Sequence, residues 1–418
     1  MKKMTAILLG AGGRAVLAYA PYAKLYPQDL EFVAVAEPIA ERRESFVQEF
    51  NIPSENVFTD WEQVFERPRL ADIAIICTQD RLHYKPAMKA LAHGYHVLLE
   101  KPMSPEPLEC IELELAAKKN DRLLTICHVL RYTNFWHAIK QTITDGRIGD
   151  VVSIQMNENV GYHHIAHSFV RGSWNNSETT SPMILAKSCH DMDILSWLMD
   201  QECTKVSSFG SLTHFTLDNA PEGSTERCLD GCAVESSCPY SAIKLYMQDR
   251  KWLSSIEVTE NGLVQALKEG KFGRCVYRCD NNVVDHQVVN LEFMNKSTAT
   301  FSMCGFTHDI SRGIQIMGTK GEIRGYMGES AFTVYNFLTR EQNEVKVRAN
   351  ASGHGGGDEG IMRSFLQEAR HYNGSQSLTS AENSVRSHLI AFAAEESRLN
   401  GGRPIDLKEF RAHLLRNQ

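Results

Sequence analysis

The chain has 418 residues, of which 43% are hydrophobic and 23% are charged, and its formal net charge at pH 7 is −7. This length exceeds one ordinary hydrophobic core and predicts two domains. The acidic balance gives no reason to expect a nucleic acid or a membrane as partner, and no stretch approaches the roughly 20 apolar residues that span a bilayer.

The N-terminal segment begins with two lysines and an apolar run, which superficially resembles the start of a signal peptide. Gly-Ala-Gly-Gly-Arg at 10–14 interrupts that run too early for the hydrophobic region of a signal, and no small-residue cleavage site follows. We therefore expect a cytoplasmic protein.

The first 130 residues alternate short apolar runs with segments of helical spacing. The apolar runs, which we predict to be strands, lie at 6–10, 31–37, 72–78, 95–100 and 123–129. Continuous apolar strands separated by helices are typical of a parallel sheet that is covered on both faces. The sequence therefore predicts an α/β first domain over residues 1–129.

A glycine pattern follows the first apolar run and opens a helical segment. Gly10, Gly12 and Ala15 form G-x-G-x-x-A. In this pattern the first glycine permits a tight turn, the second lets the backbone approach a pyrophosphate, and the third small residue lets helix and strand pack closely. The pattern predicts a Rossmann dinucleotide-binding domain, with a purely structural glycine turn as the alternative.

An acidic residue ends the second apolar run. Glu37 lies 22 residues after Ala15, close to the expected spacing of about 20, and can accept hydrogen bonds from the adenosine ribose. Its carboxylate would repel a 2′-phosphate, so we expect NAD rather than NADP as cofactor. Arg42 and Arg43 lie nearby and weaken that preference.

The fourth apolar run ends on Glu100-Lys101-Pro102. A lysine at the carboxyl end of a parallel strand points into the crevice where such sheets bind ligands. Its ammonium can hydrogen-bond the nicotinamide ribose and a substrate hydroxyl, and it favours the alkoxide that forms as hydride leaves. We therefore predict a functional role for Lys101, the alternative being a surface lysine at a strand end.

From about residue 150 the pattern changes to consecutive strand-like runs, most of which alternate polar and apolar residues. This alternation is typical of antiparallel strands with one solvated face. A helix expected at about 184–199 interrupts them, and helices at about 358–372 and 380–398 close the chain. We predict an α+β second domain over 130–418 with a largely antiparallel open sheet, whose broad face suits association into a homodimer or homotetramer.

Polar side chains concentrate at 161–174, which contains three histidines, an arginine and aromatic residues, the groups that carbohydrate binding uses. His163 and His167 stand at i, i+4 spacing, which would also suit a metal, but no zinc-protease pattern accompanies them. We favour substrate contacts for both over a structural or metal-binding role. Arg131 and Tyr132, after the fifth apolar run, are further candidates for the substrate site.

Residues 351–360 form a glycine-rich stretch before a helix. Glycines let the backbone approach a ligand closely, and His354 or Asp358 would then reach that ligand. A plain loop in which Asp358 caps the helix explains the pattern equally well. We retain His354 as a candidate substrate contact.

Five of the eleven cysteines gather in two stretches, with Cys228, Cys232 and Cys238 in the first and Cys275 and Cys279 in the second. The C-x3-C and C-x5-C spacings are looser than the C-x2-C pairs of zinc ribbons. We favour buried thiols or an occasional disulfide over a structural metal site and expect no metal cofactor.

The motif at 72–103 resembles the glucose–fructose oxidoreductase/inositol dehydrogenase/MocA (Gfo/Idh/MocA) family, whose hallmark is Glu-Lys-Pro at the end of a strand. The resemblance continues at 146–152, 188–198 and 318–326. It implies an NAD-dependent oxidoreductase with a Rossmann domain and an α+β domain, acting on a sugar or polyol. It also implies cofactor contacts at Gly10, Gly12, Gly13, Arg14, Glu37, Thr78, His83, Glu100, Lys101 and Pro102.

The resemblance further implies a catalytic histidine, which corresponds here to His190. Dehydrogenases of the family often carry an aspartate four residues earlier, but this chain has Ala186, which puts the usual Asp/His proton relay in doubt. On helical spacing Lys187, His190 and Asp191 share one face. We expect His190 to act as general base and Lys187 and Asp191 to contact the substrate, with a solvated helix face as the alternative; Asp193 is expected to orient or cap.

Three functions fit these features. The first is reversible hydride transfer between NAD and a secondary hydroxyl of a sugar, cyclitol or sugar derivative. The second is an NAD-dependent glycoside hydrolase that oxidises its substrate transiently and then eliminates the aglycone. The third is a non-catalytic regulator that senses a dinucleotide or sugar, because a fold alone does not fix a function.

Overall fold

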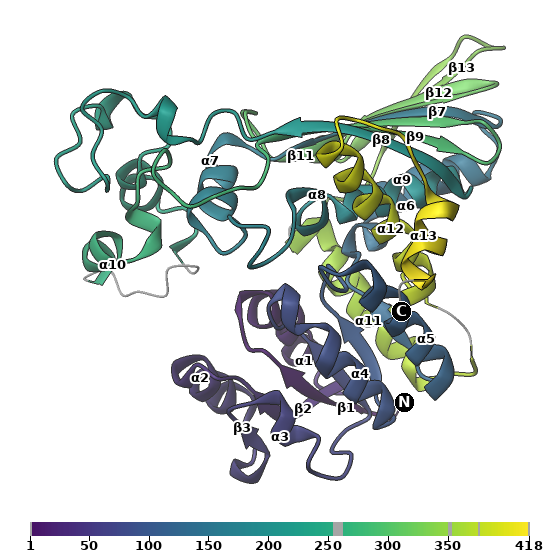
Figure 1. The fold of residues 1–418 in the computed structure, drawn as a ribbon. Helices are drawn as coiled ribbons and strands as arrows, with labels where there is room; N and C mark the ends of the chain where they lie inside the picture. The colour runs from purple at the N-terminus through teal and green to yellow at the C-terminus, as the bar shows by residue number, and fades with distance from the viewer. Residues whose placement is uncertain (1, 254–261, 350–352, 375–376, 417–418) are drawn as a thin grey trace.

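The computed structural model describes residues 2–253, 262–349, 353–374 and 377–416. It contains two sheets, which lie one above the other in Figure 1. The lower sheet is entirely parallel, in the order β3-β2-β1-β4-β5-β6. Its strands are β1 (Met4–Leu9), β2 (Leu30–Ala36), β3 (Val57–Phe58), β4 (Ile73–Ile76), β5 (His96–Leu99) and β6 (Leu124–Ile126).

Helices cover both faces of this parallel sheet, as the continuous apolar strands require. Along β1, Ile7 and Leu9 belong to one hydrophobic cluster, whereas Ala6 and Leu8 belong to the cluster on the opposite face. The helical elements that the chain forms between the strands are η1 (Ala15–Tyr19), α1 (Ala20–Leu25), α2 (Ala40–Phe50), α3 (Trp61–Val64), α4 (Tyr84–Ala92) and α5 (Pro107–Asn120), with short turns η2 (Ser54–Asn56) and η3 (Asp80–Leu82). The predicted doubly wound first domain is confirmed, and β3 is an additional strand too short for its pattern to reveal.

The upper sheet has the order β14-β13-β12-β11-β7-β10-β9-β8-β15. Its neighbouring strands are antiparallel except for the parallel pair β7 and β10, which confirms the largely antiparallel sheet. Its strands are β7 (Val151–Asn159), β8 (Cys203–Ser211), β9 (His286–Phe293), β10 (Thr298–Cys304), β11 (Ser311–Gly318), β12 (Gly321–Tyr326), β13 (Ala331–Asn336), β14 (Gln342–Lys346) and β15 (Ile405–Asp406).

Helices pack against one face of the upper sheet. They include α6 (Asn134–Thr144), which follows the turn η4 (Val129–Tyr132), together with α7 (Tyr162–His164), η5 (Ile165–Arg171), α8 (Met183–Ala186), α9 (Cys189–Met199), α12 (Ala381–Leu399) and α13 (Leu407–Arg416). The prediction of a single helix at 184–199 is wrong, because the helix is interrupted at Lys187 and Ser188, between α8 and α9. Among the described residues, none of the helices combines the length and apolar character that a bilayer crossing requires.

The helix α11 (Gly357–Arg370), expected in the second domain, packs against the first (Figure 1). Ile361, Phe365 and Leu366 are fully buried in the cluster on one face of the parallel sheet. The glycine-rich segment explains how the helix approaches so closely, because a Cβ on Gly357 would lie 2.2 Å from the carbonyl oxygen of Val129. Because α11 packs on the parallel sheet, it belongs to the core of the first domain, although it lies beyond the boundary expected between residues 129 and 130.

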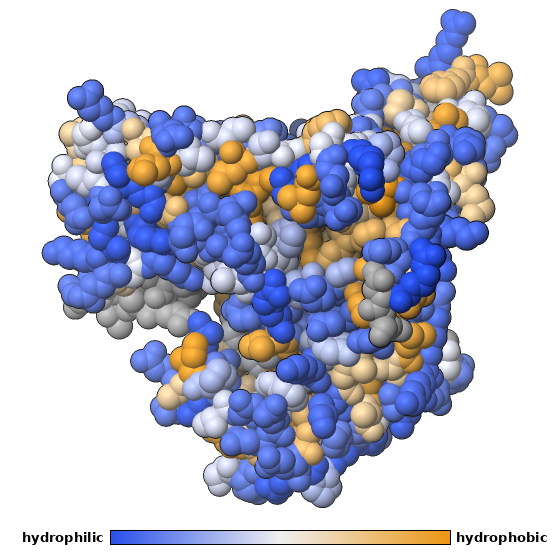
Figure 2. Space-filling view, viewed as in Figure 1, coloured by the Kyte–Doolittle hydropathy of each residue, from blue (hydrophilic) through white to orange (hydrophobic). Residues whose placement is uncertain are grey.

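Residues 212–253 and 262–285, which we call the insertion lobe, project from the upper sheet on the left of Figure 1. The described part of the lobe contains only short helical elements: η6 (Leu217–Asn219), η7 (Glu235–Ser237), η8 (Ile243–Gln248), α10 (Leu263–Glu269) and η11 (Lys271–Gly273). Figure 2 shows the surface indented between this lobe and the first domain.

We predict that Phe365→Ala lowers the free energy of unfolding of the first domain by about 3–5 kcal/mol, because it removes a buried ring and leaves a cavity. Phe337→Ala is the matched control, since Phe337 is 55% exposed, and its effect stays within about 0.5 kcal/mol. Urea unfolding followed by hydrogen exchange of the β1–β6 amides measures both. Equal, small effects of the two substitutions would contradict the packing of α11 on the parallel sheet.

Candidate active site

The glycine turn after β1 has the geometry that a dinucleotide pyrophosphate needs. Gly10 has a φ of +87°, and a Cβ there would lie 2.8 Å from the carbonyl oxygen of Cys77, so only glycine fits. A Cβ on Gly13 would meet nothing within 4 Å, and one on Gly12 would first meet Arg42 at 3.9 Å. The backbone is therefore accessible where the following helix begins, and these residues fit the phosphates of a dinucleotide.

Glu37 lies directly after β2 beside this turn. Its carboxylate accepts hydrogen bonds from the backbone N–H groups of Ala11 at 2.7 Å and Ile39 at 3.0 Å, and the residue is only 4% exposed. A carboxylate has lone pairs for further acceptor bonds, so Glu37 can still receive ribose hydroxyls. Arg43 donates to the backbone carbonyl oxygens of Glu37 and Pro38, which turns its guanidinium toward the backbone at the end of β2.

Arg14 joins the glycine turn to two distant segments. Its guanidinium donates to Glu100 at 2.7 Å, to Asp358 at 2.8 Å and to the hydroxyl of Tyr19 at 2.7 Å. Burial alone would raise the pKa of Glu100, but the charges of Arg14 and Lys101 lower it below its ordinary value. The contacts give Arg14 a structural role that the sequence did not predict, and a direct contact with the cofactor stays a prediction.

Lys101 follows β5 and reaches the second domain. Its Nζ donates a hydrogen bond to the carbonyl oxygen of Ala186 at 2.7 Å. In a continuous helix that carbonyl would accept the N–H of residue 190, but the break between α8 and α9 frees it. At position 186, where the family resemblance implied an aspartate, the backbone carbonyl of Ala186 thus serves as a neutral acceptor for Lys101.

His190 lies in the first turn of α9 and is 6% exposed. Burial lowers the pKa of its imidazole well below the ordinary value, and the positive charge of Lys101 lowers it further, followed by smaller effects of His128, His354 and Arg312. The ring is therefore neutral at physiological pH and can accept a proton. Among the described residues, its Nδ1 has no hydrogen-bond partner.

Lys187 belongs to a buried group of alternating charges. Its ammonium lies 3.0 Å from Glu158, whose other oxygen lies 2.8 Å from Arg312, and Arg312 in turn lies 2.6 Å from Asp191. Asp191 is fully buried, and this burial raises its pKa. Asp191 is held in an ion pair through Oδ1, and its contact with a substrate stays a prediction. Lys187, with a side chain 16% exposed, retains access to a ligand.

His354 joins the group from the segment before α11. Its ring centroid lies 6.1 Å from that of His190, and its Nδ1 lies 3.2 Å from the carboxylate of Asp358. The helix-capping alternative for Asp358 is not what the structure shows, because its carboxylate binds Arg14 and His354. The glycine-rich stretch therefore brings a histidine to the side of the general-base candidate.

Two predicted substrate residues are instead part of the packing. Arg131 is 3% exposed and forms a two-pronged pair with Asp193, with both N–O distances 2.7 Å. His167 is 5% exposed, stacks between Trp252 and Phe272 at 4.8 Å from each, and hydrogen-bonds Tyr246. Long-range partners that the local sequence does not reveal occupy both side chains, and the substrate contact expected of Arg131 and His167 stays a prediction.

His163 also contacts Trp252, with 5.2 Å between the ring centroids. Its neighbour His164, which the sequence argument did not single out, lies near enough to Lys187 for that positive charge to lower its pKa, after the larger effect of burial. This segment therefore lies beside the charged group through His164. Among the described residues, no three histidine, cysteine or acidic side chains form a metal-binding group.

His83 supports the turn that carries Lys101. Its ring nitrogens lie 2.6 Å from the carbonyl oxygen of Pro102 and 3.0 Å from that of Thr78. The hydroxyl of Thr78 donates to the carbonyl of Leu82. His83 and Thr78 thus connect the ends of β4 and β5, and their contact with a cofactor stays a prediction.

Sequence reasoning missed His128, which follows β6. It is fully buried between His190 and His388, at centroid distances of 5.7 and 5.4 Å, and neither ring nitrogen has a partner among the described residues. Its position at the carboxyl end of a parallel strand was the available signal. No local pattern marked Glu158 and Arg312, because each occupies an ordinary strand position.

Two further hydrogen bonds connect the domains. Asp80, in the turn after β4, accepts hydrogen bonds from the hydroxyl of Ser181 at 2.6 Å and from the indole N–H of Trp174 at 3.3 Å. These contacts hold the segment after η5 against the first domain.

Family models match nearly the whole chain. Residues 4–128 match the NAD-binding Rossmann fold of the GFO_IDH_MocA oxidoreductase family, and residues 140–407 match the C-terminal alpha/beta domain of the same family.

Individual relatives agree with this assignment. YteT of Bacillus subtilis (strain 168) is 26% identical over 322 residues, which is 73% of each chain. The NADP(+)-dependent scyllo-inositol 2-dehydrogenase IolW of the same organism is 28% identical over 130 residues, 31% of this chain and 36% of IolW. A levoglucosan dehydrogenase solved with NADH and levoglucosan shares the fold, with a TM-score of 0.72 at 17% identity, covering 97% of this chain and 99% of that one.

We predict that Arg131→Met costs about 3–5 kcal/mol of stability, because it leaves the carboxylate of Asp193 buried without its cation. The double variant Arg131→Met/Asp193→Leu should recover most of that loss, since it removes both charges together. Chemical denaturation of the wild type, the single variant and the double variant measures this difference. A stable single variant with impaired substrate binding would return Arg131 to the substrate site.

Proposed function

This chain belongs to the Gfo/Idh/MocA oxidoreductase family, and we propose that it transfers hydride between NAD and a secondary hydroxyl of a sugar, cyclitol or sugar derivative. The observation that carries the proposal is the meeting of two side chains from different domains. The ammonium of Lys101 and the neutral imidazole of His190 lie close enough for the charge of one to lower the pKa of the other. Both lie at the carboxyl end of the parallel sheet, where such folds bind ligands.

When bound, NAD supplies the hydride acceptor, and the protein supplies orientation and electrostatics. The residues at Gly10, Gly12 and Gly13 would hold the pyrophosphate, and Glu37 the adenosine ribose. The ammonium of Lys101 would donate a hydrogen bond to the reacting oxygen and stabilise the negative charge that develops on it. Ala186 orients that ammonium through its carbonyl oxygen.

His190 would take the proton of the hydroxyl. Because its pKa is lowered, the imidazole is in its basic form at neutral pH, and the proton it accepts is readily passed on. Lys187 and His354, which lie beside it, would hydrogen-bond neighbouring hydroxyls and so orient the reacting carbon. This set of hydrogen-bond donors and acceptors suits a polyhydroxylated substrate. The substrates named for IolW and for levoglucosan dehydrogenase, scyllo-inositol and levoglucosan, are of this kind.

The preference for NAD over NADP rests on Glu37, whose buried carboxylate would repel a 2′-phosphate. Arg43 donates to the backbone carbonyl oxygens of Glu37 and Pro38, and its positive charge, held next to Glu37, weakens this preference.

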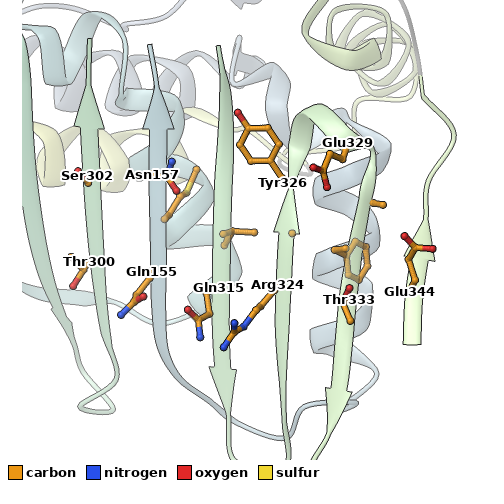
Figure 3. A pocket seen from close by; sticks show the side chains of 15 residues that line it. Gln155, Asn157, Thr300, Ser302, Gln315, Arg324, Tyr326, Glu329, Thr333 and Glu344 are labelled. Carbon is orange, nitrogen blue, oxygen red and sulfur yellow. The ribbon is translucent and has the colours of Figure 1, made fainter. Parts of the chain in front are cut away.

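We also propose that copies of the chain associate, as a dimer or tetramer, through the outer face of the upper sheet. Figure 3 shows polar side chains standing on this face along neighbouring strands, including Gln155, Thr300 and Gln315. They line an open hollow of about 630 Å³, and the face lies opposite the helices that cover the other side.

We predict that Lys101→Ala and His190→Ala each lower kcat by about 100- to 10,000-fold, the usual contribution of a positioned acid or base. The affinity of the His190 variant for NADH should stay near that of the wild type, because His190 lies in the second domain. Lys119→Ala, on the exposed side of α5, is the matched control and should keep full activity. NADH formation with a panel of sugars and cyclitols, together with NADH titration, measures these effects.

The same panel separates the rival functions. Turnover of an aryl glycoside without net NADH, with solvent deuterium entering beside the oxidised carbon, would favour the glycoside hydrolase. Binding of NAD without turnover of any substrate, and no effect of Lys101→Ala in the cell, would favour the regulator.

We predict that Glu37→Ala lowers the ratio of kcat/KM with NAD to kcat/KM with NADP by roughly 10- to 100-fold, because hydrogen bonds to a charged group contribute about 1.5–3 kcal/mol. Glu41→Ala, which removes an exposed carboxylate from α2, is the control and should leave the ratio unchanged. An unchanged ratio in the Glu37 variant would show that another residue selects the cofactor.

A further inference from the structure

Four thiols of the insertion lobe line one small cavity. They belong to Cys228, Cys232, Cys238 and Cys275, which share this cavity with Arg171. Its volume is about 20 Å³, and roughly 10–15 Å³ is enough to hold one water molecule. The cavity therefore has room for a single ion, and all four cysteines are free thiols.

The backbone of the lobe brings these thiols together from distant parts of the sequence. The N–H of Cys228 donates to the carbonyl of Gly273 at 3.0 Å, and the N–H of Cys275 donates to the carbonyl of Glu226 at 2.9 Å. This single antiparallel bridge pairs the two cysteine-containing stretches. Cys238 lies close by, since it lines the same cavity as Cys228 and Cys275.

Donors already point at the sulfur of Cys228. The backbone N–H of Ala242 lies 3.4 Å from this sulfur, and a guanidinium nitrogen of Arg171 lies 3.7 Å from it. Hydrogen bonds from N–H groups and a neighbouring cation favour a thiolate over a thiol. Two N–H donors are therefore directed at one of the sulfur atoms that line the cavity.

Arg171 is a buried cation that lines the same cavity. It is 1% exposed and forms no ion pair with a carboxylate of the described chain, and Glu235 lines the same cavity. Its guanidinium donates to the carbonyl oxygens of Arg274 and Tyr240, and its Nη1 lacks a hydrogen-bond partner in the described chain. A buried charge without a counter-charge costs several kcal/mol, so the cavity beside it suits an anionic group.

We propose that Cys228, Cys232, Cys238 and Cys275 bind one zinc ion as four thiolates and form a structural site. The C-x3-C spacing of Cys228 and Cys232 falls within the range of structural zinc sites, and four sulfur ligands satisfy the tetrahedral preference of zinc. Four thiolates around Zn²⁺ carry two net negative charges, which supply the counter-charge of Arg171.

When zinc binds, the four cysteine side chains lose their thiol protons and change direction. Each thiol loses its proton to solvent when it joins the metal, and no electron is transferred. Among the described residues no three ligating groups are arranged to hold a metal ion, so the proposed binding requires the four side chains to turn toward a common centre, about 2.3 Å from each sulfur. Cys279 is outside the set, because it does not line the cavity and its thiol donates to the carbonyl of Cys275.

The site would hold the lobe against the active site. Arg171 ends η5, the element that begins directly after His164, which lies near Lys187. The lobe also supplies Trp252 and Phe272, which cover the two faces of His167. Loss of the metal is therefore expected to loosen the substrate side of the enzyme and to leave the dinucleotide side intact.

The test is the metal content of the full-length protein purified without added chelator. Elemental analysis should find about one zinc per chain, and Cys228→Ser or Cys275→Ser should reduce it to below about a tenth. Cys304→Ser, in β10 outside the lobe, is the matched control and should keep the zinc. Replacement by Co²⁺ should give the visible bands of a tetrahedral thiolate site, and metal removal should lower Tm while NADH affinity is unchanged.

Three outcomes would overturn the proposal. One is a metal-free protein in which all eleven thiols react on denaturation. Another is a mass deficit that reports a disulfide among the four cysteines. The third is zinc that survives in a folded variant in which all four are serine, which would place the metal elsewhere.

Discussion

Burial of charge where the two domains meet is the constraint on which the rest of the structure depends. An ion taken out of water there costs several kcal/mol unless an opposite charge lies beside it. Arg14 forms an ion pair with Asp358 of α11, and Arg312 forms one with Asp191 of α9. Because the partners come from segments far apart in sequence, each pair fixes how one segment meets another. The geometry around Lys101 follows from these pairs.

The same distribution of charge explains why the histidines of the site are neutral. Burial lowers the pKa of His190, His128 and His354, and the nearby positive charges of lysine and arginine side chains lower it further. The carboxylates that would raise those values are mostly occupied by arginine or lysine. The site thus places the neutral imidazole of His190 next to the side chain of Lys101.

How much the sequence reveals depends on the range of the interaction. The strands, the turn at Gly10 and the Glu-Lys-Pro segment depend on neighbours within a few residues, and their patterns predict them. The meeting of Lys101 with His190 could be expected only through the family resemblance. The break after Ala186, the return of α11 and the stacking of His167 depend on tertiary partners, which override local helical spacing. Composition alone suggested a ligand-binding role for His167, but it could not reveal the aromatic rings that stack on this side chain.

The alanine at position 186 changes the chemistry of the site without removing its geometry. An aspartate there would give the imidazole of His190 a negative partner and raise its pKa. The backbone carbonyl of Ala186 instead takes the ammonium of Lys101 as a neutral acceptor, and Nδ1 of His190 is left without a partner in the described chain. A base of lowered pKa holds a proton weakly and releases it readily. Burial and the charge of Lys101, in place of a carboxylate, therefore set the basicity of His190.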